Sequence, residues 1–243
     1  MKKVAIITGA SRGIGAATAQ LLAKQGYAVC INYYQAKERA EKLATAINQA
    51  HGQAIAVQAN MALESDILNL FEITDKKLGP ITTLINNAGT NGGICEVEHI
   101  TAHCLQTVFA TNVFGAILAS REAIKRMKQQ NSGNIVNISS EAAKFGGTKM
   151  AHYASSKAAL NTLTIATARE VAAYNIRVNA ISPGVIDTEM HQASPPERVA
   201  ALINSLPMKR MGKAVEVAEL IAWLVSDSAA YISGTIIPIT GAR

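Results

Sequence analysis

Short runs of apolar, mostly β-branched residues recur along the chain, separated by longer stretches in which apolar residues have helical spacing. The first run, residues 4–7 (VAII), has no polar alternation, which is typical of a strand buried on both faces of a parallel sheet. Further runs lie at 29–31, 55–57, 84–85, 135–138, 178–181 and 236–237, and helical stretches lie at 16–25, 37–50, 65–77 and 156–173. This alternation predicts an α/β fold, a doubly wound parallel sheet with right-handed crossovers and helices on both faces.

The length and composition of the chain agree with one domain spanning residues 1–243. About half of the residues (49%) are apolar, and Ala, Ile, Val and Leu dominate over aromatic residues. A chain of this length can bury a large core within one α/β domain. We find no low-complexity segment, linker or internal repeat beyond the alternation of strands and helices.

A glycine-rich turn, T-G-A-S-R-G-I-G at 8–15, joins the first predicted strand to the first predicted helix. Strand, glycine turn and helix form the context of a dinucleotide-binding site. Gly9 permits the tight turn, and Gly13 and Gly15 let the backbone approach a pyrophosphate at the positive end of the helix. The spacing G-x-x-x-G-x-G differs from the common G-x-G-x-x-G, and the alternative is a glycine turn without a ligand.

A tyrosine and a lysine four residues apart, Tyr153 and Lys157, lie in a segment that is predicted to be helical. Both side chains therefore leave one face of the helix, one turn apart. A phenol has an ordinary pKa of about 10, and a neighbouring ammonium lowers it towards the working pH. The pair is a candidate acid–base site, although a surface tyrosine packed along a lysine stem would show the same spacing.

A third motif, N-N-A-G at 86–89, follows the predicted strand at 84–85. Together and in this order, T-G-x-x-x-G-x-G, N-N-A-G and Y-x-x-x-K resemble the short-chain dehydrogenase/reductase family. The resemblance runs from Val4 to about Gly234. It implies a Rossmann-like domain and an NAD(P)-dependent oxidoreductase that acts on CH–OH or C=O groups.

The resemblance implies a catalytic set of Asn112, Ser140, Tyr153 and Lys157, with Ser139 as the alternative if the serine position slips by one. Tyr153 would exchange a proton with the carbonyl oxygen, and Ser140 would hydrogen-bond that oxygen. Lys157 would lower the pKa of Tyr153 and hold the nicotinamide ribose, and Asn112 would order a water that links Lys157 to solvent. The alternatives are that Asn112 only kinks a helix and that Ser140 only caps a strand end.

The end of the second predicted strand bears on the choice of nicotinamide cofactor. An acidic residue there would bind the ribose 2′-hydroxyl and repel a 2′-phosphate, but residues 31–34 (INYY) contain none. Tyr33 stands where NAD-preferring family members tend to carry Asp, and Arg12 can meet a 2′-phosphate. We therefore expect NADP(H) to be preferred and NAD(H) to be possible. Lys37 and Arg39 either assist or are exposed helix charges.

Besides Tyr153 and Lys157, the resemblance implies cofactor contacts at Gly9, Ser11, Arg12, Gly13, Ile14, Gly15, Tyr33, Asn60, Met61, Asn87, Ala88, Gly89, Pro183, Gly184, Ile186 and Thr188. Asn60 departs from the family, which usually has Asp near the adenine. The Ile186 backbone and the Thr188 hydroxyl are expected near the nicotinamide carboxamide. A substrate lid is expected at 189–211, where an ordinary surface loop is the alternative. Residues 90–94 would form another wall, and Glu141 either points into the pocket or away from it.

Within the family, the chain looks most like 3-oxoacyl carrier-protein reductases and glucose-dehydrogenase-like reductases. Two features depart from the former: the carrier-gripping positions fall at Asn131 and Tyr174, which are not basic, and the tail 238–243 (PITGAR) differs from the usual V-D-G-G. Lys125, Lys128 or Arg169 would have to substitute. The expected activity is NADPH-dependent carbonyl reduction, with a 3-oxoacyl thioester as a candidate substrate. A sugar or polyol dehydrogenase and, more distantly, a non-catalytic nucleotide-binding protein are the alternatives.

The net charge of +6 is that of a surface with scattered Lys and Arg, and the basic cluster at 121–128 lacks the aromatic residues of a nucleic-acid site. A basic surface can still attract an anionic coenzyme A ester or an acidic carrier protein. The partners expected are therefore a small carbonyl or alcohol substrate, without nucleic acid or membrane. The family resemblance also implies a homotetramer. The helices at 112–130 and 156–173 could pack against their copies, and the residues alone do not distinguish a dimer from a tetramer.

The cysteines and the start of the chain indicate a cytoplasmic protein. Cys30 is expected in the core, whereas Cys95 and Cys104 lack metal-ligand spacing. We expect no disulfide and no metal, as in a reducing compartment. No segment is expected to reach the roughly 20 apolar residues of a membrane helix, and a strand from residue 4 leaves no room for a signal peptide. His152, beside Tyr153, is expected at the surface.

Overall fold

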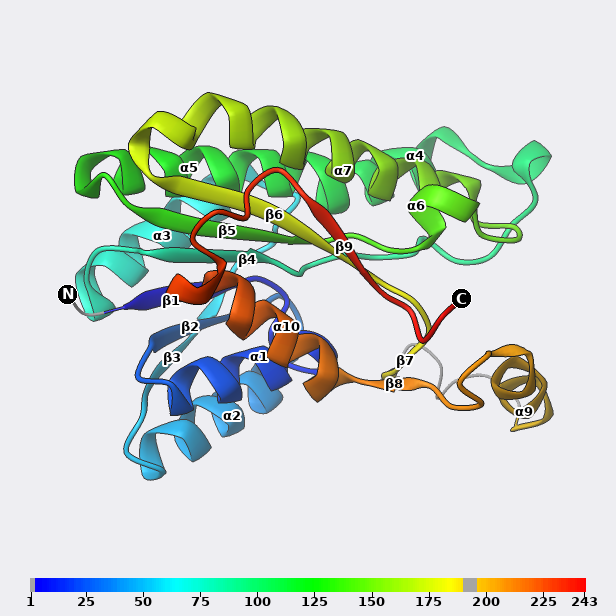
Figure 1. Cartoon of the computed structure of the whole chain (residues 1–243), viewed down its shortest axis with the longest axis horizontal. Helices are drawn as coiled ribbons and strands as arrows, with labels where there is room; N and C mark the ends of the chain where they lie inside the picture. Colours follow the sequence, from blue (N-terminus) through cyan, green and yellow to red (C-terminus); the bar gives the residue numbers. More distant parts are fainter. Residues whose placement is uncertain (1–2, 190–195) are drawn as a thin grey trace.

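A computed structural model describes residues 3–189 and 196–243 and shows seven parallel strands in one sheet (Figure 1). The strands are β1 (Val4–Ile7), β2 (Ala28–Tyr33), β3 (Gln53–Gln58), β4 (Thr83–Asn86), β5 (Gly133–Ile138), β6 (Ile176–Pro183) and β9 (Ile236–Ile239). Their order is β3-β2-β1-β4-β5-β6-β9, and every neighbouring pair is parallel. The predicted α/β fold with a doubly wound parallel sheet is therefore confirmed, and each predicted strand falls within an observed one.

Helices cover both faces of the sheet. The main ones are α1 (Gly13–Lys24), α2 (Lys37–Gln49), α3 (Glu64–Leu78), α4 (Ala102–Phe109), α5 (Gly115–Gln130), α6 (Ala142–Phe145), α7 (Ala151–Val171), α9 (Pro196–Ser205) and α10 (Ala214–Val225). One core cluster joins the sheet to α1, α2 and α10, and a second joins the opposite face to α3, α5 and α7. Figure 1 shows these two groups of helices on opposite sides of the sheet.

The apolar strand runs are explained by this double burial. In β1, Ala5 and Ile7 pack in the first cluster and Val4 and Ile6 in the second, and all four are completely buried. Alternate residues of a strand point to opposite faces, so a strand covered on both sides has no solvent-facing position. The predicted core position of Cys30 is confirmed, because it is fully buried in β2.

The strand order reverses between β1 and β4, which are neighbours although two further strands separate them in sequence. Ligands of open α/β sheets bind at the carboxyl ends of the strands at such a reversal. The glycine turn follows β1, and the N-N-A-G segment begins at the end of β4. The topology therefore brings these two motifs to one edge of the sheet.

The long helical stretch before β5 differs from its expected form. It comprises α4, a π-helical segment at Ala110–Phe114 and α5. Ala102–Gln130 also contains an 18-residue window with a mean hydropathy of 1.3, of which 33% is buried. By length and composition this stretch qualifies as a membrane-spanning candidate, so the expectation that no segment would do so was wrong. A helix that packs on a protein core meets the same criterion.

The segment after β6 carries two short strands, β7 (Ile186–Asp187) and β8 (Gly212–Lys213), which pair in parallel. Helix α9 lies between them in the sequence and extends from the body of the molecule in Figure 1. The expected lid at 189–211 falls partly outside the described residues, at 190–195. Its described part contains α9 and a turn that leads into β8.

Candidate active site

The glycine turn and the N-N-A-G segment pack tightly against each other. Gly9 has a φ of 61°, and a Cβ added to it would lie 2.8 Å from the Ala88 Cα. A Cβ on Gly15 would lie 2.6 Å from the Asn87 Nδ2 and 2.8 Å from the Ala10 Cα. Both positions therefore require glycine, because backbone atoms cannot move aside for a methyl group.

Hydrogen bonds from Thr8 hold the two motifs together. The Thr8 Oγ1 accepts from the backbone N–H groups of Asn87 and Ala88, each at 2.9 Å. The Asn87 side chain donates in return to the Thr8 and Gly9 carbonyl oxygens at 2.8 and 3.0 Å. On the other side, the Asn32 Oδ1 accepts from the Gly9 N–H at 3.0 Å. The turn is therefore braced from both neighbouring strands before any ligand binds.

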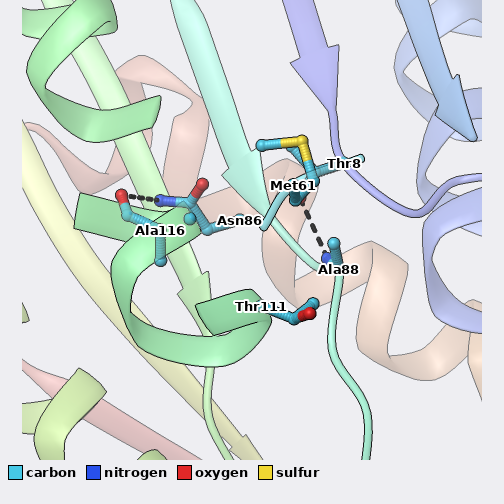
Figure 2. Close-up of a pocket in the computed structure, with 7 residues that line it drawn as sticks. Thr8, Met61, Asn86, Ala88, Thr111 and Ala116 are labelled. Carbon is cyan, nitrogen blue, oxygen red and sulfur yellow. Dashed lines mark hydrogen bonds between the residues drawn. The ribbon is translucent and has the colours of Figure 1, made fainter. Parts of the chain in front are cut away.

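A small cavity lies behind this contact, between Thr8, Met61, Ala88 and Thr111 (Figure 2). Its volume is about 10 Å³, which is close to the least that one water molecule needs. Met61 itself is 5% exposed. This space is therefore an internal packing gap and not the cofactor cleft.

Ser140 and Tyr153 meet where β5 ends and α7 begins. Burial raises the pKa of the Tyr153 phenol above its ordinary value of 10.0, and the Ser140 side chain, which lies close enough to act on the phenol, opposes that change. Ser139 faces the other way: its hydroxyl donates to the Lys157 carbonyl oxygen at 3.2 Å. The geometry therefore places Ser140, and not Ser139, beside the phenol.

Lys157 lies deep beside Tyr153, with 4% of its surface exposed. Its Nζ donates to the Ile138 carbonyl oxygen at 2.7 Å and lies 5.8 Å from the centre of the Tyr153 ring. Burial lowers the pKa of Lys157 to about 8. Burial is the largest influence on the pKa of Tyr153, and the expected lowering of that pKa by Lys157 stays a prediction.

Asn112 occupies the π-helical segment and is 1% exposed. Its Oδ1 accepts from the Thr90 N–H at 2.8 Å, and its Nδ2 donates to the Thr90 carbonyl at 2.9 Å and to the Ser156 Oγ at 3.0 Å. A Cβ on Gly89 would lie 3.3 Å from the Asn112 Oδ1 and 3.4 Å from the Lys157 Nζ. The structure thus brings Asn112 and Lys157 together around Gly89.

His152 is 2% exposed, so the expectation of a surface histidine was wrong. Its Nε2 lies 2.8 Å from the Asn91 carbonyl oxygen. A Cβ on Gly92 would lie 3.1 Å from the His152 ring. His152 therefore ties the start of α7 to the 90–94 segment, a role that the sequence did not signal.

Glu141 and the C-terminal tail meet beside the turn at Pro183 and Gly184. The Glu141 Oε1 lies 2.8 Å from the Arg243 Nη1, and the Oε2 lies 3.2 Å from where a Cβ on Gly184 would be. Burial raises the pKa of the Glu141 carboxyl, and Arg243 opposes that change. Glu141 therefore points under the turn after β6, and the unusual tail of this chain reaches the residue that follows Ser140.

The residues expected near the adenosine half of the cofactor, which we call the adenosine end, differ in exposure and in hydrogen bonding. Tyr33 is 6% exposed and contributes to the core, whereas Tyr34 is 54% exposed. The Asn60 Oδ1 accepts from the Ala62 N–H at 3.0 Å, so it stabilises its own turn. No acidic side chain belongs to the described β2, as expected. The Tyr33 side chain therefore packs inward, and a cofactor contact at this residue stays a prediction.

Two arginines lie at this end and are more than half exposed. Arg12 and Arg39 both pair with Glu189, which follows β7 and Thr188. A Cβ on Gly13 would lie 3.4 Å from the Thr188 Cγ2. The segment after β7 therefore lies against the glycine turn.

Outside this region, Glu96, Glu98 and His99 bring possible metal ligands within 4.8 Å of one another among the residues described. All three are exposed, and the Lys149 Nζ lies 2.8 Å from the Glu96 Oε1. These residues share no hydrogen bond or ion pair with the Ser140–Tyr153–Lys157 group in the described part of the chain. The absence of a metal site stays a prediction.

Comparison with known proteins identifies the framework that carries this group. A family model described as short chain dehydrogenase matches residues 3–199. The chain belongs to the short-chain dehydrogenase/reductase family. As a member of this family it is an NAD(P)-dependent oxidoreductase with a Rossmann-like fold. The backbone cradle at Gly9 and Gly15 and the exposed arginines fit a dinucleotide with anionic phosphates.

Two relatives and one solved structure illustrate the range of the family. Uncharacterized oxidoreductase YgfF of Escherichia coli K12 is 44% identical over 245 residues, covering 99% of each chain. The 3-oxoacyl-[acyl-carrier-protein] reductase FabG of Staphylococcus aureus is 35% identical over 242 residues, covering 99% of this chain and 98% of the relative. A double mutant of a Serratia marcescens short-chain dehydrogenase/reductase superposes with a TM-score of 0.92 at 34% identity, covering 99% and 97% of the two chains.

Proposed function

We propose that this protein is an NADPH-dependent carbonyl reductase in which Tyr153 is the general acid. The observation that carries the proposal is the buried Lys157, whose Nζ lies 5.8 Å from the centre of the Tyr153 ring, together with Ser140 acting on the same phenol. Nucleotide binding alone needs no phenol placed close to a serine hydroxyl and a buried ammonium. The group is what proton transfer to a carbonyl oxygen requires.

The protonation states of Tyr153 and Lys157 determine the role that each residue has in the proposed reaction. When bound, NADPH supplies the hydride for the carbonyl carbon. Because burial raises the pKa of Tyr153, the phenol is protonated at neutral pH and can donate to the oxygen. Ser140 can hydrogen-bond the same oxygen as it gains charge, and the Lys157 ammonium then stabilises the phenolate that remains.

In this mechanism Asn112 positions other residues and does not itself exchange a proton with the substrate. Its bonds to both backbone groups of Thr90 and to Ser156 fix the segment after N-N-A-G against α7. This holds Gly89 beside the Lys157 Nζ. A water held here would link Lys157 to solvent and restore the proton that Tyr153 gives away.

The cofactor preference rests on charge at the adenosine end. The end of β2 carries no carboxylate to accept from a ribose 2′-hydroxyl, and Arg12 and Arg39 supply two guanidinium groups. Guanidinium groups bind phosphate through charge-assisted hydrogen bonds. We therefore assign NADPH as the preferred cofactor, with NADH as the weaker one. Gly13, Ser11 and Ile14 would offer backbone to the pyrophosphate.

A 3-oxoacyl thioester is the first substrate class to test, because relatives named as 3-oxoacyl reductases match almost the whole chain. Tyr174 and Asn131, at the carrier-gripping positions, are not basic. However, the Lys128 Nζ lies 4.3 Å from the centre of the Tyr174 ring, so a cation is present at that site. If Lys128 does not replace the missing arginines or lysines, a sugar or polyol becomes the better candidate.

The assembly is proposed to be a homotetramer in the cytoplasm. Leu105, Phe114 and Ile117 on the α4–α5 stretch are 41%, 56% and 41% exposed, and Ile165 on α7 is 36% exposed. Exposed apolar faces of this kind are typical of interfaces between subunits. Packing of these helices against a second copy would cover them and accounts for the membrane-like hydropathy of Ala102–Gln130.

The test is NADPH consumption with an acetoacetyl thioester and small ketones, and NADP+ reduction with a panel of sugars and polyols, with wild type beside Tyr153→Phe. Thioester reduction by wild type that collapses in Tyr153→Phe, at unchanged NADPH binding, supports the full proposal. Turnover of only sugars or polyols supports the dehydrogenase alternative. NADPH binding without turnover of any of these compounds contradicts the reductase and favours a non-catalytic role.

A further inference from the structure

One carboxylate draws together the two arginines of the adenosine end. The Arg12 Nη1 lies 3.3 Å from the Glu189 Oε2, and the Arg39 Nη1 pairs with the Oε1 of the same residue. Arg12 belongs to the glycine turn and Arg39 to the first turn of α2, and Glu189 is 177 and 150 residues away from them in the sequence. Each carboxylate oxygen therefore takes one guanidinium, and the arrangement shows that both arginines can reach a single anion.

Glu189 belongs to the segment after β7, which is expected near the nicotinamide, and its side chain extends from there to Arg12 and Arg39. It follows β7 and Thr188, and Thr188 lies against Gly13 in the glycine turn. The two arginines hold the pKa of the Glu189 carboxyl below its ordinary value, with the hydrogen bond from Arg39 as the largest cause. The carboxylate is therefore ionised at neutral pH and occupies an anion position that the chain supplies itself.

We propose that Glu189 competes with the 2′-phosphate of NADPH for Arg12 and Arg39. This inference rests on the proposed NADPH preference. A phosphate monoester carries about −1.5 to −2 charges at pH 7 and three acceptor oxygens, so it displaces a carboxylate of charge −1. The 2′-hydroxyl of NADH carries no charge and leaves the Glu189 pairs in place. Glu189 therefore weakens the binding of NADPH selectively and reduces the discrimination between the two cofactors.

The experiment measures dissociation constants of NADPH, NADH, 2′,5′-ADP and 5′-AMP for the full chain and for Glu189→Gln. Glutamine keeps the shape of the side chain and removes its charge. Glu38→Gln is the matched control, because Glu38 is an exposed carboxylate next to Arg39 and its removal changes the net charge equally. A third variant combines Glu189→Gln with Arg39→Ala.

Glu189→Gln is expected to tighten the binding of NADPH and 2′,5′-ADP about two- to fivefold, the upper part of the range of exposed ion pairs. NADH and 5′-AMP are expected to change less than about twofold. The gain should shrink when Arg39 is absent, because the two residues act through one contact. Tightening of NADPH no greater than in Glu38→Gln, or an equal change for NADH, overturns the inference and leaves the NADPH preference standing. Wild type and Glu189→Gln that both bind 2′,5′-ADP no better than 5′-AMP overturn the NADPH preference as well.

Discussion

Replacing Lys157 with methionine should remove a pH dependence of stability that this buried ammonium imposes. Burial lowers the pKa of Lys157 from 10.5 to about 8. The unfolded chain therefore binds more protons than the folded chain between these pH values, and the free energy of unfolding rises with pH across that window. At about 1.4 kcal/mol for each pH unit, the full difference is about 3 kcal/mol, lost to stability at neutral pH.

The part of this difference that falls between pH 7 and pH 9 can be worked out from the same two pKa values. Linkage between protonation and folding assigns about 1.3 kcal/mol of added stability to wild type over that interval. Lys157→Met lacks the titrating ammonium, so this contribution to the pH dependence of its free energy of unfolding is absent. The assay is urea unfolding of both proteins at pH 7 and pH 9 at one protein concentration, because the difference between wild type and variant cancels the other titrating groups.

Wild type should gain about 1 kcal/mol relative to Lys157→Met on going from pH 7 to pH 9. The variant should also lose turnover, since the ammonium that stabilises the phenolate is gone. A relative gain of zero, or a relative loss as the pH rises, would refute the reasoning that Lys157 is destabilised by burial. An active-site lysine is expected to lower the stability of the folded chain in this way, because its burial serves catalysis and not folding.

Two further changes test the geometry. Ser140→Ala should lower kcat about 10²- to 10³-fold, the usual cost of one hydrogen-bond donor to a developing oxyanion, whereas Ser139→Ala should keep kcat within about tenfold; equal losses would mean that the wrong serine has been assigned. Gly15→Ala should lower the free energy of unfolding by about 1–3 kcal/mol, because the added methyl group meets the Asn87 side chain and the Ala10 backbone. Wild-type stability in urea together with wild-type NADPH binding would contradict this close contact.

Much of the fold was predictable because the parallel strands are buried on both faces. Such strands must be apolar throughout, so their positions are visible as short runs in the sequence. Tyr153 and Lys157 were predictable as a pair because both lie within one helix at a spacing of four. Ser140 was assigned through the family resemblance with Ser139 as the alternative, because which of the two side chains faces Tyr153 depends on how β5 ends against α7.

Other features depend on contacts between distant segments. The π-helical segment at Asn112 is supported by hydrogen bonds to Thr90 and Ser156, and local spacing carries no signal for it. His152 is buried because the 90–94 segment folds over it. Glu189 meets Arg12 and Arg39 across more than half of the chain. Helical spacing and turn composition describe neighbours in sequence, so contacts of this kind are found only in the structure.

In the proposed mechanism, Tyr153 gives the proton to the substrate oxygen. Single-turnover oxidation of NADPH by Tyr153→Phe, with NADPH binding measured in parallel, tests it most directly. We expect a rate at least about 10²-fold below that of wild type, with an NADPH dissociation constant within about twofold of the wild-type value. A rate close to that of wild type would rule out Tyr153 as the general acid, because the phenylalanine side chain has no proton to give.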